Sequence, residues 1–181
     1  TETSAISHLF SPNYGLETSK KVKDSQAGDT ETINLYSSPE YGQVNSSIVD
    51  PLGLALQTDS AYESAGSGFL RQTEKILPGG IATSYEYYAA NESRDNPCTA
   101  AEDSVLQGGF VKTRTDPDPD GLLTQYSSRS IESVYDASGR IVAERYNNDP
   151  WTCISYDERG RQTQKVIAGA TGRTINYDYL V

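Results

Sequence analysis

Short runs rich in apolar, β-branched and aromatic residues alternate with clusters of Gly, Pro, Asn, Asp and Ser along most of the chain. These clusters favour turns, and strand-like runs between them, at a spacing of about 8–12 residues, are typical of all-β folds. No segment shows sustained helical periodicity, although Thr99–Gln107 can hold one short helical turn. The expected strands are Leu16–Lys23, Thr30–Ser37, Gln43–Val49, Leu54–Tyr62, Phe69–Leu77, Ile81–Ala89, Gly109–Arg114, Ile141–Tyr146, Trp151–Tyr156, Gln162–Ile167 and Arg173–Tyr177.

The pair Tyr-Asp recurs at a fixed step of 21 residues near the C-terminus, and a fixed period is the signature of a repeat architecture. An Asp side chain can open a turn by accepting a hydrogen bond from the backbone two residues on, and Gly supplies the positive φ that closes it. We expect the following Arg to start the returning strand and to pair with the Asp. If exposed, such a pair contributes only about 0–1 kcal/mol, so it sets register more than stability. The repeat residues are Tyr135, Asp136, Gly139, Arg140, Tyr156, Asp157, Gly160, Arg161, Tyr177 and Asp178.

The motif Tyr-Asp-x-x-Gly-Arg at this period resembles the YD repeats of the Rhs and teneurin-like superfamily. Looser matches, such as Asp50-Pro51-Leu52-Gly53-Leu54 and Asp149-Pro150-Trp151-Thr152-Cys153, resemble the secreted bacterial type. The resemblance implies a spiral of β-hairpins, which in longer family members curls into a shell around a polypeptide cargo. It also implies an extracellular or cell-surface location, with adhesion, toxin delivery and carbohydrate binding as contexts. Because 181 residues are too few for a full shell, we expect a segment of the spiral or a small self-assembling unit.

The regularity of the motif predicts three regions. Residues 1–14 form an irregular entry segment, and 15–108 hold divergent YD-type hairpins with a surface loop at 91–108. Residues 109–181 hold the regular 21-residue repeats.

The charge balance excludes several classes of partner. Fifteen basic against twenty-five acidic residues give a net charge of −10, whereas a nucleic-acid binder usually carries a basic footprint. No run of about 20 apolar residues is present, so we expect no membrane span. The composition is rich in Tyr, Ser, Thr and Gly, which favours an extended sheet with a thin core over a thick globule. No cofactor is expected.

Two cysteines, Cys98 and Cys153, lie 55 residues apart. In an extracellular protein a disulfide is the natural interpretation, and by chain entropy such a loop adds roughly 4 kcal/mol. The alternative is two buried thiols. A zinc site is not expected, because two Cys and one distant His fall short of four ligands.

Three other groups of residues suggest chemistry. Tyr85, Tyr87, Tyr88, Tyr146 and Trp151 are candidates for an aromatic platform that binds sugar rings; the alternative is cross-strand packing, which aromatic pairs also favour. The acidic turn with Asp116, Asp118 and Asp120 matches the opening of an EF-hand loop but places Ser127 where the loop needs a bidentate Glu, so it is a weak calcium candidate. A catalytic triad would have to use His8, the only histidine, and it lies in the weakly patterned entry segment.

The sequence therefore predicts a non-enzymatic structural or interaction module that pairs its strands with neighbouring repeats or with copies of itself. The alternative is an adhesion module that binds surface glycans through exposed Tyr and Trp side chains.

Overall fold

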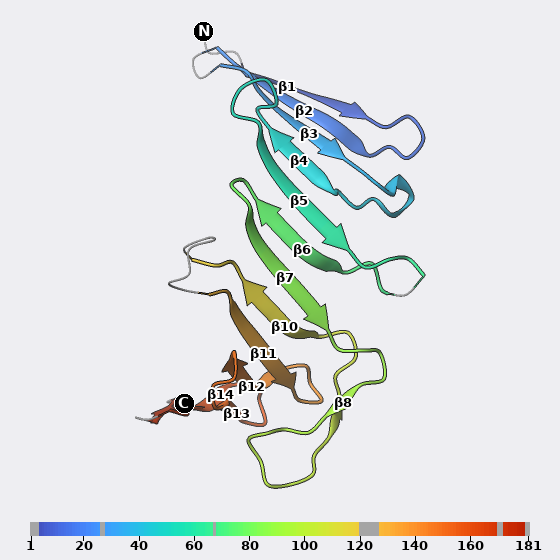
Figure 1. Cartoon of the computed structure of the whole chain (residues 1–181). Coiled ribbons are helices and arrows are strands. Elements are labelled where there is room, and N and C mark those ends of the chain that lie inside the picture. The colour runs from blue at the N-terminus through green and yellow to red at the C-terminus, as the bar shows by residue number, and fades with distance from the viewer. Residues whose placement is uncertain (1–3, 26–27, 67, 120–126, 170–171, 180–181) are drawn as a thin grey trace. The chain divides into compact units, whose positions relative to one another are not determined.

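The computed structural model describes residues 4–25, 28–66, 68–119, 127–169 and 172–179. The fold is all-β, with fifteen strands among these residues and one short 3-10 helix, η1 (Pro39–Tyr41). Strands that follow one another along the chain pair antiparallel, in the order β1-β2-β3-β4-β5-β6-β7-β10-β11-β12-β13-β14-β15 (Figure 1). The strands β8 and β9 form a separate two-stranded ribbon. The expected series of antiparallel hairpins is confirmed.

The chain divides into two compact units, Thr1–Thr83 and Ser84–Val181, and the division lies within β7. The strands of unit 1, with the start of β7, are β1 (Ser4–Phe10), β2 (Glu17–Asp24), β3 (Thr30–Leu35), β4 (Ser46–Val49), β5 (Leu56–Tyr62), β6 (Gln72–Leu77) and β7 (Ile81–Tyr87). Those of unit 2, with the end of β7, are β8 (Ser93–Arg94), β9 (Val105–Leu106), β10 (Val111–Asp116), β11 (Arg129–Tyr135), β12 (Ile141–Tyr146), β13 (Thr152–Tyr156), β14 (Gln162–Ile167) and β15 (Arg173–Asn176).

Two expectations about local structure are wrong. Residues 4–10 are not irregular, because they form β1, which pairs along its whole length with β2. The segment 99–107 contains no helical turn; it ends in the short strand β9, which pairs with β8. In both places the pairing partner, which lies in another part of the chain, decides the backbone conformation.

The turn between β6 and β7 shows how local sequence fixes a hairpin. Gly79 and Gly80 both adopt positive φ, at 88° and 81°, a conformation that costs glycine little. The backbone N–H of Gly80 donates to the carbonyl oxygen of Leu77 at 3.1 Å. The hairpin predicted from Pro78-Gly79-Gly80 is therefore confirmed.

The core is thin and lies in unit 2. Among the described residues, the apolar side chains that are fully buried are Tyr88, Val134 and Ala143. Val134 faces Ala143 across β11 and β12, and Ala143 faces Cys153 across β12 and β13. This short row is the centre on which the insertion between β7 and β10 packs.

Candidate functional site: a repeated locked turn

A β-bulge occurs at the same place in each of the two hairpins that carry the full sequence motif. In β11–β12, Val134 faces Ala143 but Tyr135 faces Ile141, so one residue of β12 is skipped. In β13–β14 the same shift separates Ser155 from Tyr156. A bulge bends the strand and increases its twist. The tyrosine of each motif therefore marks the position where the strand bends into the turn.

Each bulge is followed by a turn that its aspartate closes from within. The backbone N–H of Asp136 donates to the carbonyl oxygen of Arg140 at 2.9 Å. The Asp136 carboxylate accepts the backbone N–H groups of Ser138 (2.8 Å) and Arg140 (3.0 Å), and the Nε–H of Arg140 (2.7 Å). Gly139 has φ +77°, and a Cβ there would come within 2.9 Å of the Phe110 ring. We call this arrangement of acid, turn and arginine the locked turn.

Asp157 and Arg161 repeat the same set of contacts. The backbone N–H of Asp157 donates to the Arg161 carbonyl oxygen at 2.9 Å, and its carboxylate accepts the Arg161 N–H at 2.8 Å and Nε–H at 2.7 Å. The backbone hydrogen bond from Arg161 is the main cause that lowers the pKa of Asp157. For Asp136, burial acts to raise the pKa, but the hydrogen bonds from Arg140 outweigh it and the pKa is lowered. The predicted Asp–Arg pairs are confirmed.

A third locked turn lies in unit 1, where the sequence period gave no indication of it. The bulge separates Ala61 from Tyr62, and the backbone N–H of Glu63 donates to the carbonyl oxygen of Arg71 at 2.9 Å. The Glu63 carboxylate accepts the backbone N–H of Phe69 at 2.8 Å and the Nε–H of Arg71 at 2.9 Å. The hydrogen bond from the Arg71 side chain lowers the pKa of Glu63 to about 2. Here a glutamate replaces aspartate in a turn that is four residues longer.

Two further hairpins keep the bulge without the acid. Phe10 faces Glu17 in β1–β2 after the same shift, and Tyr87 faces Val111 in β7–β10. The backbone N–H of Tyr88, which stands where the acid would be, donates to the Phe110 carbonyl oxygen at 3.0 Å. The sequence signal that could have revealed these turns is an aromatic residue at the end of a strand, with the returning strand at a variable distance.

Tyrosine side chains connect the two locked turns of unit 2 to the strand that follows each of them. The Tyr156 hydroxyl donates to the carbonyl oxygen of Ile141 at 2.9 Å, and the Arg140 guanidinium lies 4.6 Å from the centre of the Tyr156 ring. Arg140 is thus held between its own aspartate and the tyrosine of the following repeat, in a cation–π geometry. Burial raises the pKa of Tyr156.

In the last repeat Tyr179, not Tyr177, takes the place of Tyr156. The Tyr179 hydroxyl donates to the Gln162 carbonyl oxygen at 2.9 Å, and Arg161 lies 4.6 Å from its ring centre. The pairing of Lys165 with Ile175 shows that β15 is displaced by two residues relative to the preceding repeat. A shift of two keeps each side chain on its face of the sheet, so the structural repeat continues where the sequence period does not.

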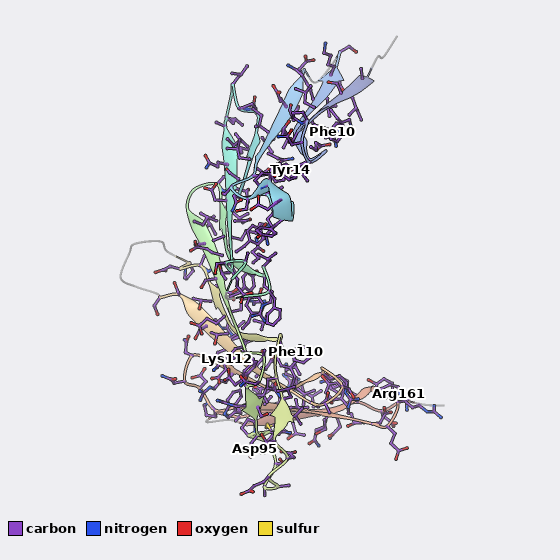
Figure 2. The ribbon with its side chains drawn as sticks, turned by 90° about the vertical axis from the view of Figure 1, so that its right-hand side faces the viewer. Phe10, Tyr14, Asp95, Phe110, Lys112 and Arg161 are labelled. Carbon is purple, nitrogen blue, oxygen red and sulfur yellow. A yellow bond between two sulfur atoms is a disulfide. The ribbon has the colours of Figure 1, made fainter. Side chains whose placement is uncertain are left out.

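The insertion between β7 and β10, residues 89–110, is fastened to β11–β13 by three kinds of contact. Cys98 and Cys153 form a disulfide, as one of the two sequence interpretations predicted. Arg94, on β8, pairs with Glu132 at 2.8 Å. Figure 2 labels Asp95 within this insertion and Phe110 where it joins β10.

The third contact is a fully buried side-chain amide. Gln107 accepts the backbone N–H of Tyr135 at 2.9 Å and donates to the Tyr135 carbonyl oxygen at 2.8 Å and to that of Val105 at 3.1 Å. It therefore pairs with Tyr135 as a neighbouring strand would, beside the bulge. Nothing in the sequence distinguishes Gln107 from the other glutamines.

The proposed aromatic platform does not form one surface. Tyr88 is fully buried, its hydroxyl donates to the Ser133 carbonyl oxygen at 2.8 Å, and burial raises its pKa to about 12. The prediction of Tyr88 as a sugar-binding residue is therefore wrong, because the Tyr88 side chain is buried against β11. Tyr87, at the bulge of β7–β10, is partly buried.

Tyr85 and Tyr146 do lie in one cross-strand row, with Arg114 and Ile131 between them. Trp151 is stacked on Arg145, 4.6 Å from the centre of its ring. Because Arg145 and Tyr146 are adjacent on β12, their side chains point to opposite faces. Trp151 is therefore on the face of the sheet opposite Tyr146.

The calcium candidate receives no support from geometry. Asp116 pairs with Arg114 at 2.9 Å, and Asp120 lies outside the described residues. In the part of the chain that the structure describes, including Asp118, no three His, Cys, Asp or Glu side chains are grouped to hold a metal ion. His8, the histidine that a catalytic triad would have to use, lies on β1, and its Nδ1 is hydrogen-bonded to the Glu17 carboxylate on β2 at 2.5 Å.

No helix among the described residues is long and apolar enough to cross a membrane. No known family model matches the chain, and no curated protein matches it.

Proposed function

We propose that the chain is a non-enzymatic structural and interaction module, a segment of YD-type hairpin repeats from a secreted or cell-surface shell, stalk or fibre. The observation that carries the proposal is the locked turn. It uses the carboxylate, guanidinium and tyrosine groups of Asp136, Arg140 and Tyr156 to join one hairpin to the next. Carboxylate and guanidinium groups, which act as catalytic groups in many enzymes, here form the contacts that join neighbouring hairpins.

The energetics also favour a role in assembly. A single hairpin is at best marginally stable in water, and stacked repeats gain stability from their neighbours. With only three fully buried apolar side chains among the described residues, the chain relies on pairing between strands. Each of the outermost described strands, β1 and β15, has one hydrogen-bonded neighbour in the sheet order, which leaves an edge for pairing with another repeat or another copy.

The disulfide supports an extracellular or cell-surface location. Disulfides persist in oxidising compartments and are rare in the cytosol. The bond Cys98–Cys153 fastens the insertion to β13, so it belongs to the structure of unit 2.

Light scattering over a range of protein concentrations, combined with amide exchange, tests the proposal. We expect the molar mass to rise above 19.7 kDa with concentration, and the amides of β15 to exchange rapidly in dilute protein. A constant 19.7 kDa species in which the amides of both edge strands are strongly protected would contradict it, because the edges would then be capped within one chain.

A glycan-binding module is the second candidate, and the row of Tyr85, Arg114 and Tyr146 favours it because it combines aromatic rings with a charged donor on one face. Glycan-array binding that is lost in Tyr146→Ala and retained in Trp151→Ala would support this function. Trp151 is a matched control, since it is the aromatic side chain on the opposite face. An array without ligands would remove the second candidate.

A further inference from the structure

A small pocket lies between two neighbouring turns of unit 1. The turn from β3 to β4 contains η1, the turn from β5 to β6 is the locked turn of Glu63, and both lie at the same end of the strands (Figure 1). The pocket has a volume of about 240 Å³, and Tyr41 lines it from the first turn and Leu70 from the second. Pockets for drug-sized ligands measure about 300–1,000 Å³, so this pocket suits a smaller molecule.

Hydrogen bonds to the backbone hold the walls of the pocket in place. The side-chain Nε2 group of Gln43 donates to the carbonyl oxygen of Leu70 at 2.6 Å, which connects the two turns. The Tyr62 hydroxyl donates to the Val44 carbonyl oxygen at 3.1 Å. Because these side chains are fixed before a ligand arrives, binding would order few additional groups and would cost little conformational entropy.

The charge of the pocket excludes an ionic ligand. Among the described residues that line it, Glu63 is the only one with a charged side chain. The Glu63 carboxylate accepts the backbone N–H groups of Phe69 and Arg71 and pairs with the Arg71 guanidinium at 2.6 Å. An anionic or cationic ligand would therefore meet no unpaired opposite charge in this lining, so the ligand is expected to be neutral.

Polar groups that the protein itself does not use surround an aromatic ring in the pocket. Within the described part of the chain, no group is hydrogen-bonded to the side-chain hydroxyl of Ser38 or Tyr41, or to the Oε1 atom of Gln43. Each hydroxyl can donate and accept, and Oε1 can accept. Tyr41 is 46% exposed, so its ring is accessible at the rim. An aromatic ring beside hydroxyl and amide groups suits a molecule that is apolar on one face and polar at its edge.

We propose that this pocket binds one neutral hexopyranose unit, stacked on the ring of Tyr41 and hydrogen-bonded by Ser38 and Gln43. A pyranose ring carries hydroxyl groups around its edge, which supply donors and acceptors for all three side chains, and one of its faces presents C–H groups to the aromatic ring. The pocket is separate from the tyrosine row of unit 2 described above. The proposal also does not depend on assembly between strands.

NMR titration of the isotope-labelled protein with methyl glycosides tests the proposal. The probes are the methyl glycosides of glucose, galactose, mannose and N-acetylglucosamine, each added separately. For a ligand of this size, held by a few contacts, we expect a Kd on the order of 1 mM for at least one probe. The backbone amide signals of Tyr41, Gln43 and Ser64 should shift with that Kd, whereas those of unit 2 should stay in place.

Substitutions in the pocket identify the site. Tyr41→Ala removes the stacking ring and should weaken binding about tenfold. Tyr14→Ala is the matched control, since it removes a ring that is 52% exposed in another turn of unit 1 (labelled in Figure 2), and it should leave the Kd unchanged. Ser38→Ala removes only a hydroxyl and should weaken binding severalfold. Because Ser38→Ala keeps the ring, it decides the test even if Tyr41→Ala fails to fold.

Three results would overturn the proposal. The first is no shift with any of the four glycosides at about fifty times the expected Kd. The second is a Kd that is unchanged in Tyr41→Ala and Ser38→Ala but weakened in Tyr146→Ala, which would assign the binding to the tyrosine row of unit 2. The third is a larger shift of the same amides with sodium phosphate, which would contradict a neutral ligand. A protein that stays monomeric but binds a glycoside here would contradict the proposed assembly and support the pocket.

Discussion

Replacement of Gln107 tests whether a buried side-chain amide substitutes for a strand at the bulge of β11. Gln107→Met keeps nearly the same volume but removes both hydrogen bonds to Tyr135 and the one to Val105. A buried polar group left without a partner costs about 1–3 kcal/mol. The N–H and C=O of Tyr135 are two such groups, so we expect a loss of about 2–4 kcal/mol after the gain from burying an apolar side chain.

Urea denaturation followed by the fluorescence of the single tryptophan, Trp151, is the appropriate assay, since Trp151 and Gln107 belong to the same unit. With a slope of about 1.5 kcal/mol per M, the expected loss moves the midpoint down by about 1–3 M. Gln164→Met is the matched control: its Nε2 donates to the Asn176 side chain in an exposed contact, and we expect a change within about 0.5 kcal/mol.

A second substitution at the same position makes the test independent of volume. In Gln107→Glu the protonated carboxyl can accept from the Tyr135 N–H and donate to its C=O, as the amide does, but the carboxylate cannot donate. The pKa of the new carboxyl is therefore raised in the folded state, and its favourable contribution is present below about pH 4.3 and lost as pH rises. If Gln107→Met stays within 0.5 kcal/mol of the parent, or Gln107→Glu shows no pH-dependent loss relative to it, the strand-substitute role is refuted.

Three further outcomes are expected. Replacing Cys98 and Cys153 together by serine should lower the unfolding free energy of unit 2 by roughly 4 kcal/mol, measured by Trp151 fluorescence in urea, and a loss below about 1 kcal/mol would contradict an entropic role for the bond. The Glu63 carboxyl should titrate by NMR with a pKa of about 2, so its stabilisation is present above about pH 4.3 and lost as pH falls toward 2; a midpoint above 4 would contradict the lock. Tyr179→Phe should cost about 1 kcal/mol and speed amide exchange in β15, while Tyr177→Phe should do so less, and equal effects would refute the two-residue shift.

The sequence predicted those features that depend on a few neighbouring residues. The strands Ile141–Tyr146 and Gln162–Ile167 have the expected bounds, and the turn at Gly139 has the expected positive φ. Asp136 and Arg140 are four residues apart, so their pairing follows from the turn alone.

Features that depend on distant segments were missed. The lock of Glu63 and Arg71 spans eight residues instead of four, so the fixed 21-residue period did not reveal it, although its bulge also lies at a tyrosine. Tyr88 seemed a surface residue because its burial comes from β11, some 45 residues away. Gln107 has no local signal at all, since its partner Tyr135 is 28 residues distant.

The length of the bulged turn varies widely between hairpins that have the same bulge. Between the paired residues at the bulge, five residues (136–140) suffice in one hairpin, while twenty-three (88–110) occupy the same place in another. Closing the longer loop costs only about 1.4 kcal/mol more in chain entropy. The bulged turn is thus a position that accepts a long, disulfide-linked insertion, while the paired strands on either side keep their register.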